Sequence, residues 1–255
     1  MMMIEKPMRR WAAAVAVAAW GIAWASAAEL DHRREYRDCM DLARRDPEAA
    51  NETAKHWQAL GGGEPALHCI ATALFELGQT AEAAKRLEAL AESSRQDADV
   101  RAGLLAQAAQ AWLADGDAAR AQAVLTAALK LAPDDPGLLV DRAVAAATLG
   151  NYADATRDLS RTVEVEPNNT EAWALRAAAR RHLGETAAAM TDVETALGLS
   201  PSFPDAYLER GILKRLAGDT AGARADWMRV LQIAPDSDVA DSARAYLEAM
   251  DVKNR

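Results

Sequence analysis

The chain has few of the residues that carry catalysis or bind metal ions. Among its 255 residues only two are cysteine and four are histidine, and aromatic residues make up 5%. The histidines are isolated in the sequence, so they and the cysteines do not form the clustered ligand set that a metal site requires. No glycine-rich phosphate loop and no serine nucleophile motif with a suitably spaced base is present. We therefore expect no enzyme activity, no cofactor and no bound metal.

An excess of positive charge is also missing. The chain has 29 Lys and Arg against 38 Asp and Glu, a formal net charge of −9. Such a surface repels nucleic-acid phosphates and anionic lipids, so we expect neither as a partner. No alternating strand pattern is present. Hydrophobic residues make up 51% of the chain, with many alanines, and this composition favours closely packed helices with small contact residues.

One long apolar run lies near the N-terminus. Lys6, Arg9 and Arg10 precede about 14 apolar residues from Trp11 to Trp24, and Ala25-Ser26-Ala27 follows them. This order is typical of a cleavable export signal, which we assign to residues 1–27, with cleavage after Ala28 as the second choice. The run is short for a membrane span of about 20 residues. We expect a periplasmic protein with no membrane insertion after cleavage; an uncleaved segment that anchors the chain in the inner membrane is the alternative.

The sequence repeats with a period of 34 residues. Pro133, Pro167, Pro201 and Pro235 are each 34 residues apart, and glycines and alanines recur in the same register. A fixed period of this size is typical of a repeat architecture. The recurring small residues are Gly116, Gly150, Gly184 and Gly218, and Ala121, Ala155, Ala189 and Ala223.

Two of these units carry the clearest pattern of small, large and proline positions. The pattern reads Trp173, Ala177, Ala189, Val193, Ala196 and Pro201, and then Tyr207, Gly211, Ala223, Trp227, Val230 and Pro235. These columns resemble the tetratricopeptide repeat (TPR) family, in which each unit is a helix, a tight turn and a second helix. The resemblance implies an all-α fold, a right-handed α-solenoid of stacked units with a C-terminal capping helix.

The register of the repeats divides the mature chain. Residues 28–63 are expected to form a degenerate N-terminal capping pair of helices. The array covers 64–237, and residues 238–255 form a capping helix and a tail. Its units are about 64–97, 102–135, 136–169, 170–203 and 204–237. An insertion at 97–100 is expected either to lengthen the following helix or to introduce a kink.

Cys39 and Cys69 are expected to form a disulfide. An exported chain meets an oxidising compartment, where a lone pair of cysteines is most simply bonded. In the TPR register each cysteine lies on the first helix of its own unit, and such helices pack side by side. Closing this loop would stabilise the fold by about 3–4 kcal/mol in the entropic model. Two buried free thiols are the alternative.

An arginine and an aspartate recur together in the last three units. In the unit before them both are replaced, by Ala108 and Val124. We interpret the pattern as a structural ion pair between the two helices of each unit rather than as a basic ligand-binding stripe. The predicted pairs are Arg142 with Asp158, Arg176 with Asp192, and Arg210 with Asp226.

Function is expected on the face lined by the first helices. In the TPR family this face is concave, and here it reads as smooth and apolar, with two arginines and a histidine near one end. The lysines and asparagines with which family members clamp a terminal carboxylate are missing from the corresponding positions. The predicted partner-binding residues are Val140, Val144, Arg181, His182, Leu208, Ile212 and Arg215.

The predicted function is a non-enzymatic protein–protein interaction scaffold of the bacterial cell envelope. Its partner would be a protein or peptide segment that is apolar and could carry an acidic group for the two arginines. The alternative is a self-associating structural protein, whose groove is filled by its own chain or by a second copy in a homodimer.

Overall fold

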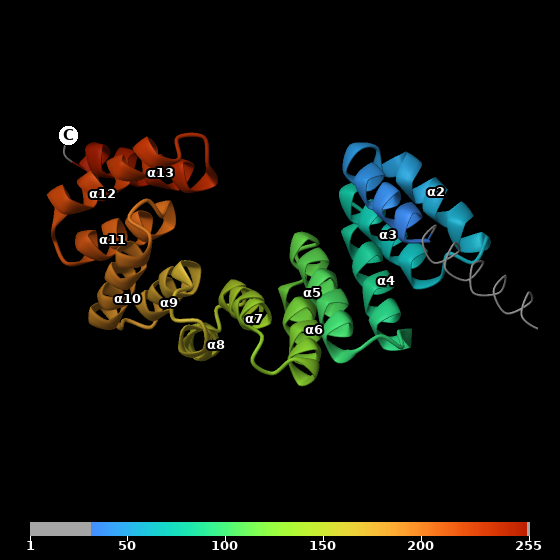
Figure 1. Ribbon diagram of the computed structural model, residues 1–255. Coiled ribbons are helices and arrows are strands. Elements are labelled where there is room, and N and C mark those ends of the chain that lie inside the picture. The colour runs from blue at the N-terminus through green and yellow to red at the C-terminus, as the bar shows by residue number, and fades with distance from the viewer. Residues whose placement is uncertain (1–31, 254–255) are drawn as a thin grey trace, which may run out of the picture. The chain divides into compact units, whose positions relative to one another are not determined.

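The computed structural model describes residues 32–253, and within that range all regular structure is helical (Figure 1). The helices are arranged in two compact parts, one up to Arg86 and one from Leu87 onward. Residues 1–27, which we assign to the export signal, lie outside the described residues. The all-α fold of stacked helical pairs is as predicted.

The N-terminal part consists of helical residues 32–45 and the next helices in the chain, α2 (Pro47–Ala59), α3 (Gly63–Glu76) and the start of α4 (Thr80–Ser93). Asp46 begins α2 by accepting a hydrogen bond from the Ala49 amide, and Pro47 occupies the first turn, where no amide donor is needed. Cys39 and Cys69 form a disulfide that joins helix 32–45 to α3, as the expected side-by-side packing requires. Both cysteines are buried.

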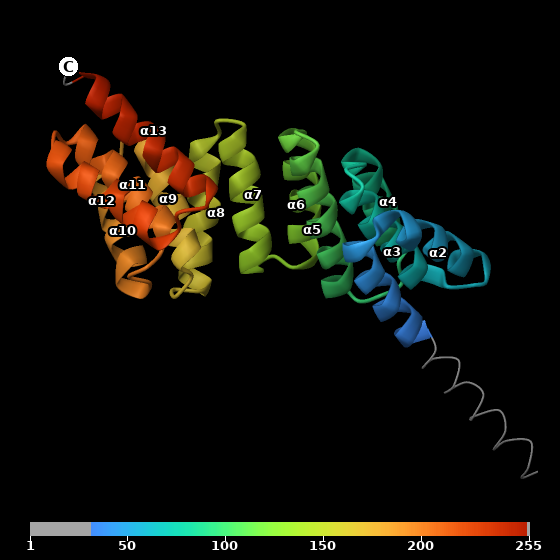
Figure 2. The ribbon, with the colours of Figure 1, turned by 90° about the horizontal axis from the view of Figure 1, so that it is seen from above.

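The C-terminal part continues with successive pairs of helices. Adjacent helices pack on one another throughout, and Figure 2 shows the pairs following one another in chain order. The helices are α5 (Ala98–Ala114), α6 (Ala118–Leu131), α7 (Pro136–Thr148), α8 (Tyr152–Val165), α9 (Thr170–His182), α10 (Thr186–Leu199), α11 (Pro204–Leu216), α12 (Thr220–Ile233) and α13 (Asp238–Lys253).

The recurring glycines end the first helix of each pair. Gly116, for example, has φ +85°, a left-handed conformation that glycine adopts without strain. Its amide donates to Leu113 O and the Asp117 amide donates to Trp112 O, which satisfies carbonyls left open at the helix end. Asp117 then caps α6 by accepting from the Arg120 amide. The turn and the next helix are thus specified together.

The insertion at 97–100 lengthens a helix. Asp97 caps α5 by accepting a hydrogen bond from the Val100 amide, and α5 has 17 residues where α7, α9 and α11 have 13. Of the two outcomes expected for the insertion, the first is the one observed.

The three predicted ion pairs are all formed within their repeat units. Arg176 donates two hydrogen bonds to Asp192, at 2.9 and 2.7 Å, and the carboxylate of Asp192 also accepts from Arg180 at 2.6 Å. Removing one partner of such a buried pair is costly, because it leaves the other charge buried and uncompensated. The equivalent pairs are Arg142 with Asp158 and Arg210 with Asp226, both bidentate.

An aromatic residue in the first helix holds the proline linker. Trp173 donates its indole N–H to the carbonyl of Pro167 at 2.8 Å, and Tyr207 donates its hydroxyl to the carbonyl of Pro201 at 3.1 Å. The guanidinium of Arg176 lies 4.5 Å above the Trp173 ring. Trp173 is half-buried.

In the last repeat unit a glycine and a tryptophan compensate each other. Trp227 is fully buried where the preceding unit has Val193. Gly211, where that unit has Ala177, lies so close that an added Cβ would overlap the Trp227 indole. Trp227 also stacks on Tyr246 of α13 at 4.9 Å between ring centres, so α13 covers the end of this core as predicted (Figure 2).

This compensation predicts a rescue. Gly211→Ala should destabilise the C-terminal part by about 1–3 kcal/mol because it overpacks the core. Adding Trp227→Leu, which removes the opposing ring, should recover part of that loss, although Trp227→Leu alone should itself be destabilising because it leaves a cavity. Urea unfolding of the four proteins measures this coupling. If the double variant lost as much stability as the two single variants together, the two residues would not compensate each other.

Candidate functional site

Two adjoining hollows lie along α9. The first, about 450 Å³, is formed by α9, α11 and the linker before α11. The second, about 320 Å³, is formed by α7, α8 and α9. Leu175 and Ala178 line both hollows, so the two form one surface that we name the α9 groove. Small residues make the space: Ala174 and Ala178 face the first hollow, and Ala143, Ala147 and Ala178 face the second.

Three of the predicted partner-binding residues line the α9 groove. Val144 and His182 lie in the second hollow and Leu208 in the first. Val140 is buried in the core among neighbouring helices, which leaves it little surface to offer a partner. Ile212 and Arg215 line neither hollow. The sequence placed all of them on one face without distinguishing core from groove.

The chain itself covers one end of the predicted surface. Leu208 and Ile212 pack against the cluster of Trp227, Val230 and residues of α13. Both side chains are therefore half-buried. A substitution at Ile212 would disturb this core, which makes Val144 the better position for a test of binding.

Arg181 is already paired. Its Nε donates to Oε1 of Glu209 at 2.5 Å, which joins α9 to α11. Burial raises the pKa of the Glu209 carboxyl above its usual range, and the charge and hydrogen bond of Arg181 oppose that shift. The expectation that Arg181 waits for an acidic group on a partner does not match this geometry, because the guanidinium is engaged within the fold.

His182 forms part of the wall of the second hollow. Its ring stacks on Tyr152 of α8, with 4.1 Å between ring centres and 4° between planes. Burial lowers the pKa of His182 below its usual value, and the positive charge of Arg181 lowers it further. Both effects favour the uncharged imidazole, and the stacked pair presents flat ring surface to the second hollow.

Carboxylates that the sequence did not single out lie along the same face. Glu171 and Asp205 line the first hollow, from the first turns of α9 and α11. Asp141 of α7 lines a smaller hollow of about 190 Å³ between α5 and α7. Burial raises the pKa of Asp141, a hydrogen bond from Gln110 opposes the shift, and the nearby charges of Glu171 and Asp135 add to it.

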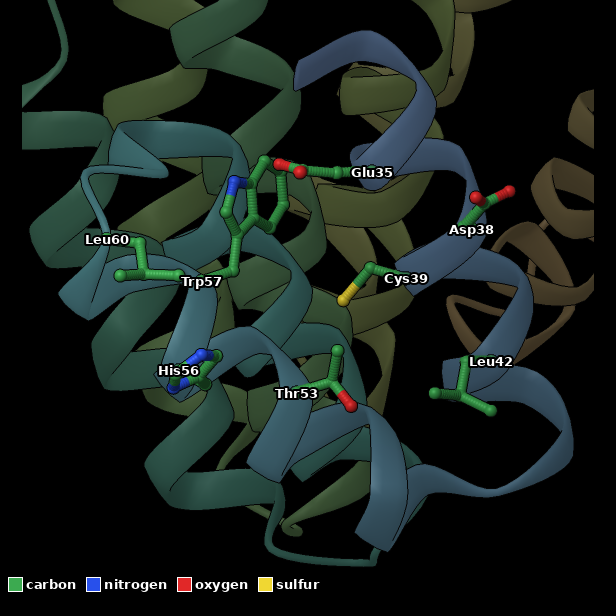
Figure 3. A pocket seen from close by; sticks show the side chains of 8 residues that line it. All are labelled: Glu35, Asp38, Cys39, Leu42, Thr53, His56, Trp57 and Leu60. Carbon is green, nitrogen blue, oxygen red and sulfur yellow. The ribbon is translucent and has the colours of Figure 1, made fainter. Parts of the chain in front are cut away.

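Another hollow lies in the N-terminal part, between helix 32–45 and α2 (Figure 3). Its volume is about 340 Å³, and Cys39 and Trp57 lie in its wall. The indole N–H of Trp57 is buried and has no hydrogen-bond partner among the residues described. None of the predicted partner-binding residues lies here. The remaining lining residues are Glu35, Asp38, Leu42, Thr53, His56 and Leu60.

Comparisons with known proteins agree with this architecture. Two sequence profiles described as tetratricopeptide repeat match the chain, over residues 109–180 and 183–239. The chain belongs to the tetratricopeptide repeat family. Proteins with TPR folds are in general non-catalytic scaffolds for protein–protein interaction. No curated protein matches the chain.

Solved TPR structures share the fold at low sequence identity. MamA from Desulfovibrio magneticus RS-1 is 20% identical, with a TM-score of 0.59 over 69% of this chain and 97% of that one. TTC0263, a TPR protein from Thermus thermophilus, is 20% identical, with a TM-score of 0.58 over 72% and 99%. YrrB, described as a TPR protein with an unusual peptide-binding site, is 18% identical, with a TM-score of 0.54 over 75% and 96%.

Two searches of the described residues in this TPR chain found nothing. Between 32 and 253, no three His, Cys, Asp or Glu side chains are grouped so that they could hold a metal ion. A search of the same residues finds no helix with the length and apolar character that a membrane span needs. The α9 groove offers apolar floor, flat rings and carboxylates, which suit the binding of a polypeptide segment.

Proposed function

We propose that this TPR protein is an exported, non-enzymatic scaffold of the bacterial cell envelope that binds an apolar segment of a partner protein in the α9 groove. The observation that carries the proposal is the continuity of the two hollows through Leu175 and Ala178. A continuous apolar concavity exposed on a helical scaffold is typical of a site for a polypeptide.

The geometry supports a segment rather than a small molecule. The two hollows lie along three successive first helices, α7, α9 and α11, and among residues 32–253 both are open to solvent. Helices packed side by side have axes about 8–10 Å apart, so a chain that crosses all three contacts both hollows at once. The peptide-binding site in the description of YrrB supports the same use of the fold, though YrrB shares only 18% identity with this chain.

Self-association is the second candidate, favoured by one observation. The packing of α13 beside Leu208 and Ile212 shows that a helix of this chain can cover part of the surface next to the groove. A second copy could present the same apolar helix to the hollows that remain open. A homodimer that disappears on substitution in the α9 groove would support this alternative.

Val144→Gln should strongly weaken partner binding, because it places an uncharged polar group on the apolar floor of the second hollow. The matched control is Val165→Gln, a position on α8 that is 41% exposed and lines neither hollow. Both variants, beside the wild type, serve as bait in affinity capture from an envelope extract, after circular dichroism shows equal folding. A partner retained by wild type and Val165→Gln and lost by Val144→Gln is the expected result. A partner retained equally by all three places the site elsewhere.

Export is a proposal that rests on residues 1–27 and on the cysteine pair. A bacterium that expresses the complete chain should yield a soluble mature protein whose N-terminal sequence begins at Ala28, or at Glu29 if cleavage follows Ala28. Denaturation without reductant should release no free thiol, because Cys39 and Cys69 are bonded. Recovery of the intact chain in the membrane fraction would favour an uncleaved anchor instead.

A further inference from the structure

Carboxylates line the first hollow of the α9 groove and the smaller hollow between α5 and α7. Asp141, Glu171 and Asp205 come from three successive first helices, α7, α9 and α11. Asp141 takes a hydrogen bond from the neutral amide of Gln110. Among the described residues, neither Glu171 nor Asp205 forms an ion pair with a Lys or Arg side chain.

We name these three carboxylates the carboxylate edge. Burial raises the pKa of Asp141 and the negative charge of Glu171 adds to that shift, while Glu171 shares the first hollow with Asp205. Desolvation by the surrounding protein raises the pKa of Asp205, although solvent still reaches its side chain. Like charges held together in this way repel one another, and a cation placed between them relieves that repulsion.

The arginines near the groove do not cancel this charge. Arg181 is held by Glu209, and Arg176 and Arg180 are both held by Asp192 inside the repeat unit. These three arginines of α9 thus form ion pairs within the fold, while the carboxylates at the start of α9 and α11 line the first hollow. Of the two arginines that the sequence singled out, Arg181 is paired with Glu209 and Arg215 lines neither hollow, so neither places a free positive charge in the groove.

We propose that the partner segment held in the α9 groove is basic as well as apolar, with Lys or Arg side chains that lie against Asp141, Glu171 and Asp205. This inference rests on the proposed function, since it names the chemistry of the same site. Apolar side chains of the segment fill the two hollows beside Leu175 and Ala178. Its cations pair with the carboxylate edge, and the overall charge of the chain, −9, attracts such a segment from a distance.

A first-turn carboxylate also stabilises its own helix through the helix dipole, so the experiment needs a control for that role. Glu48 of α2 and Asp238 of α13 supply it. Both are exposed carboxylates in the first turn of a helix, and neither lines the groove. The variant Glu171→Gln with Asp205→Asn and the control Glu48→Gln with Asp238→Asn therefore change the net charge and the helix ends equally.

The probe is a library of random peptides of about 12 residues, long enough to cross three helices. The mature chain, from Ala28, selects from this library, and the affinity of the most enriched peptide is then measured by fluorescence anisotropy. Enriched peptides should combine Lys or Arg with apolar residues. Binding should weaken about tenfold in Glu171→Gln with Asp205→Asn, the effect of two partly screened ion pairs, and remain unchanged in the matched control.

The contrary results separate the two proposals. Enriched peptides that are neutral or acidic, or equal weakening in both double variants, would overturn the basic segment. Ala178→Trp fills the position shared by both hollows and tests the groove itself. If Ala178→Trp lost binding while Glu171→Gln with Asp205→Asn did not, the groove would still be supported as the binding site. Only its preference for a basic segment would be wrong. Unchanged binding in Ala178→Trp, or no enrichment at all, would contradict both.

Discussion

The close approach of paired helices at buried alanines is the constraint on which the rest of this structure depends. Ala121, Ala155, Ala189 and Ala223 are fully buried, one in each of four successive repeat units. Because these side chains are small, the two helices of a unit pack tightly and the large residues fill the space between units. The same preference for alanine continues onto the groove, where Ala174 and Ala178 leave the hollows open. The stable core and the open groove thus both result from the small alanine side chains at these positions.

Positive and negative side chains occupy different places in the repeat units. Arginines that recur with the repeat lie between the helices of a unit, each held by an aspartate of the second helix. Such partly buried pairs are fully engaged and contribute no free positive charge to the surface. The carboxylates of Glu171 and Asp205 lie instead where two units meet the groove, without a cationic partner among the residues described. The side chains of Glu171 and Asp205 therefore give the proposed binding surface an acidic border, although arginines are abundant in the sequence around it.

Much of this could be predicted from the sequence because it repeats. Helix ends follow from Asp and Asn caps, glycines and prolines in fixed register, and the pairing of Arg142 with Asp158 follows from their joint absence in the preceding unit. The partner of Arg181 could not be found in this way, because Glu209 lies in the next unit, outside the repeated pair. The hollows are a property of packing between helices, and no single column of the repeat encodes them. Glu171 and Asp205 are visible in the sequence, but the family's carboxylate clamp predicts lysine and asparagine on this face, so acidic residues were not considered.

Photo-crosslinking from the groove would test the central claim most directly, that the α9 groove holds a basic, apolar segment of a partner protein. A photoreactive residue replaces Thr148, an exposed residue that lines the second hollow, and in a matched protein it replaces Thr191, an exposed residue of α10 outside both hollows. After irradiation in the envelope, the crosslinked peptides are identified by mass spectrometry. Crosslinks from position 148 to one segment with Lys or Arg among apolar residues, and none from position 191, are the predicted result. Equal crosslinking from both positions, or a crosslinked segment that is acidic, would contradict it.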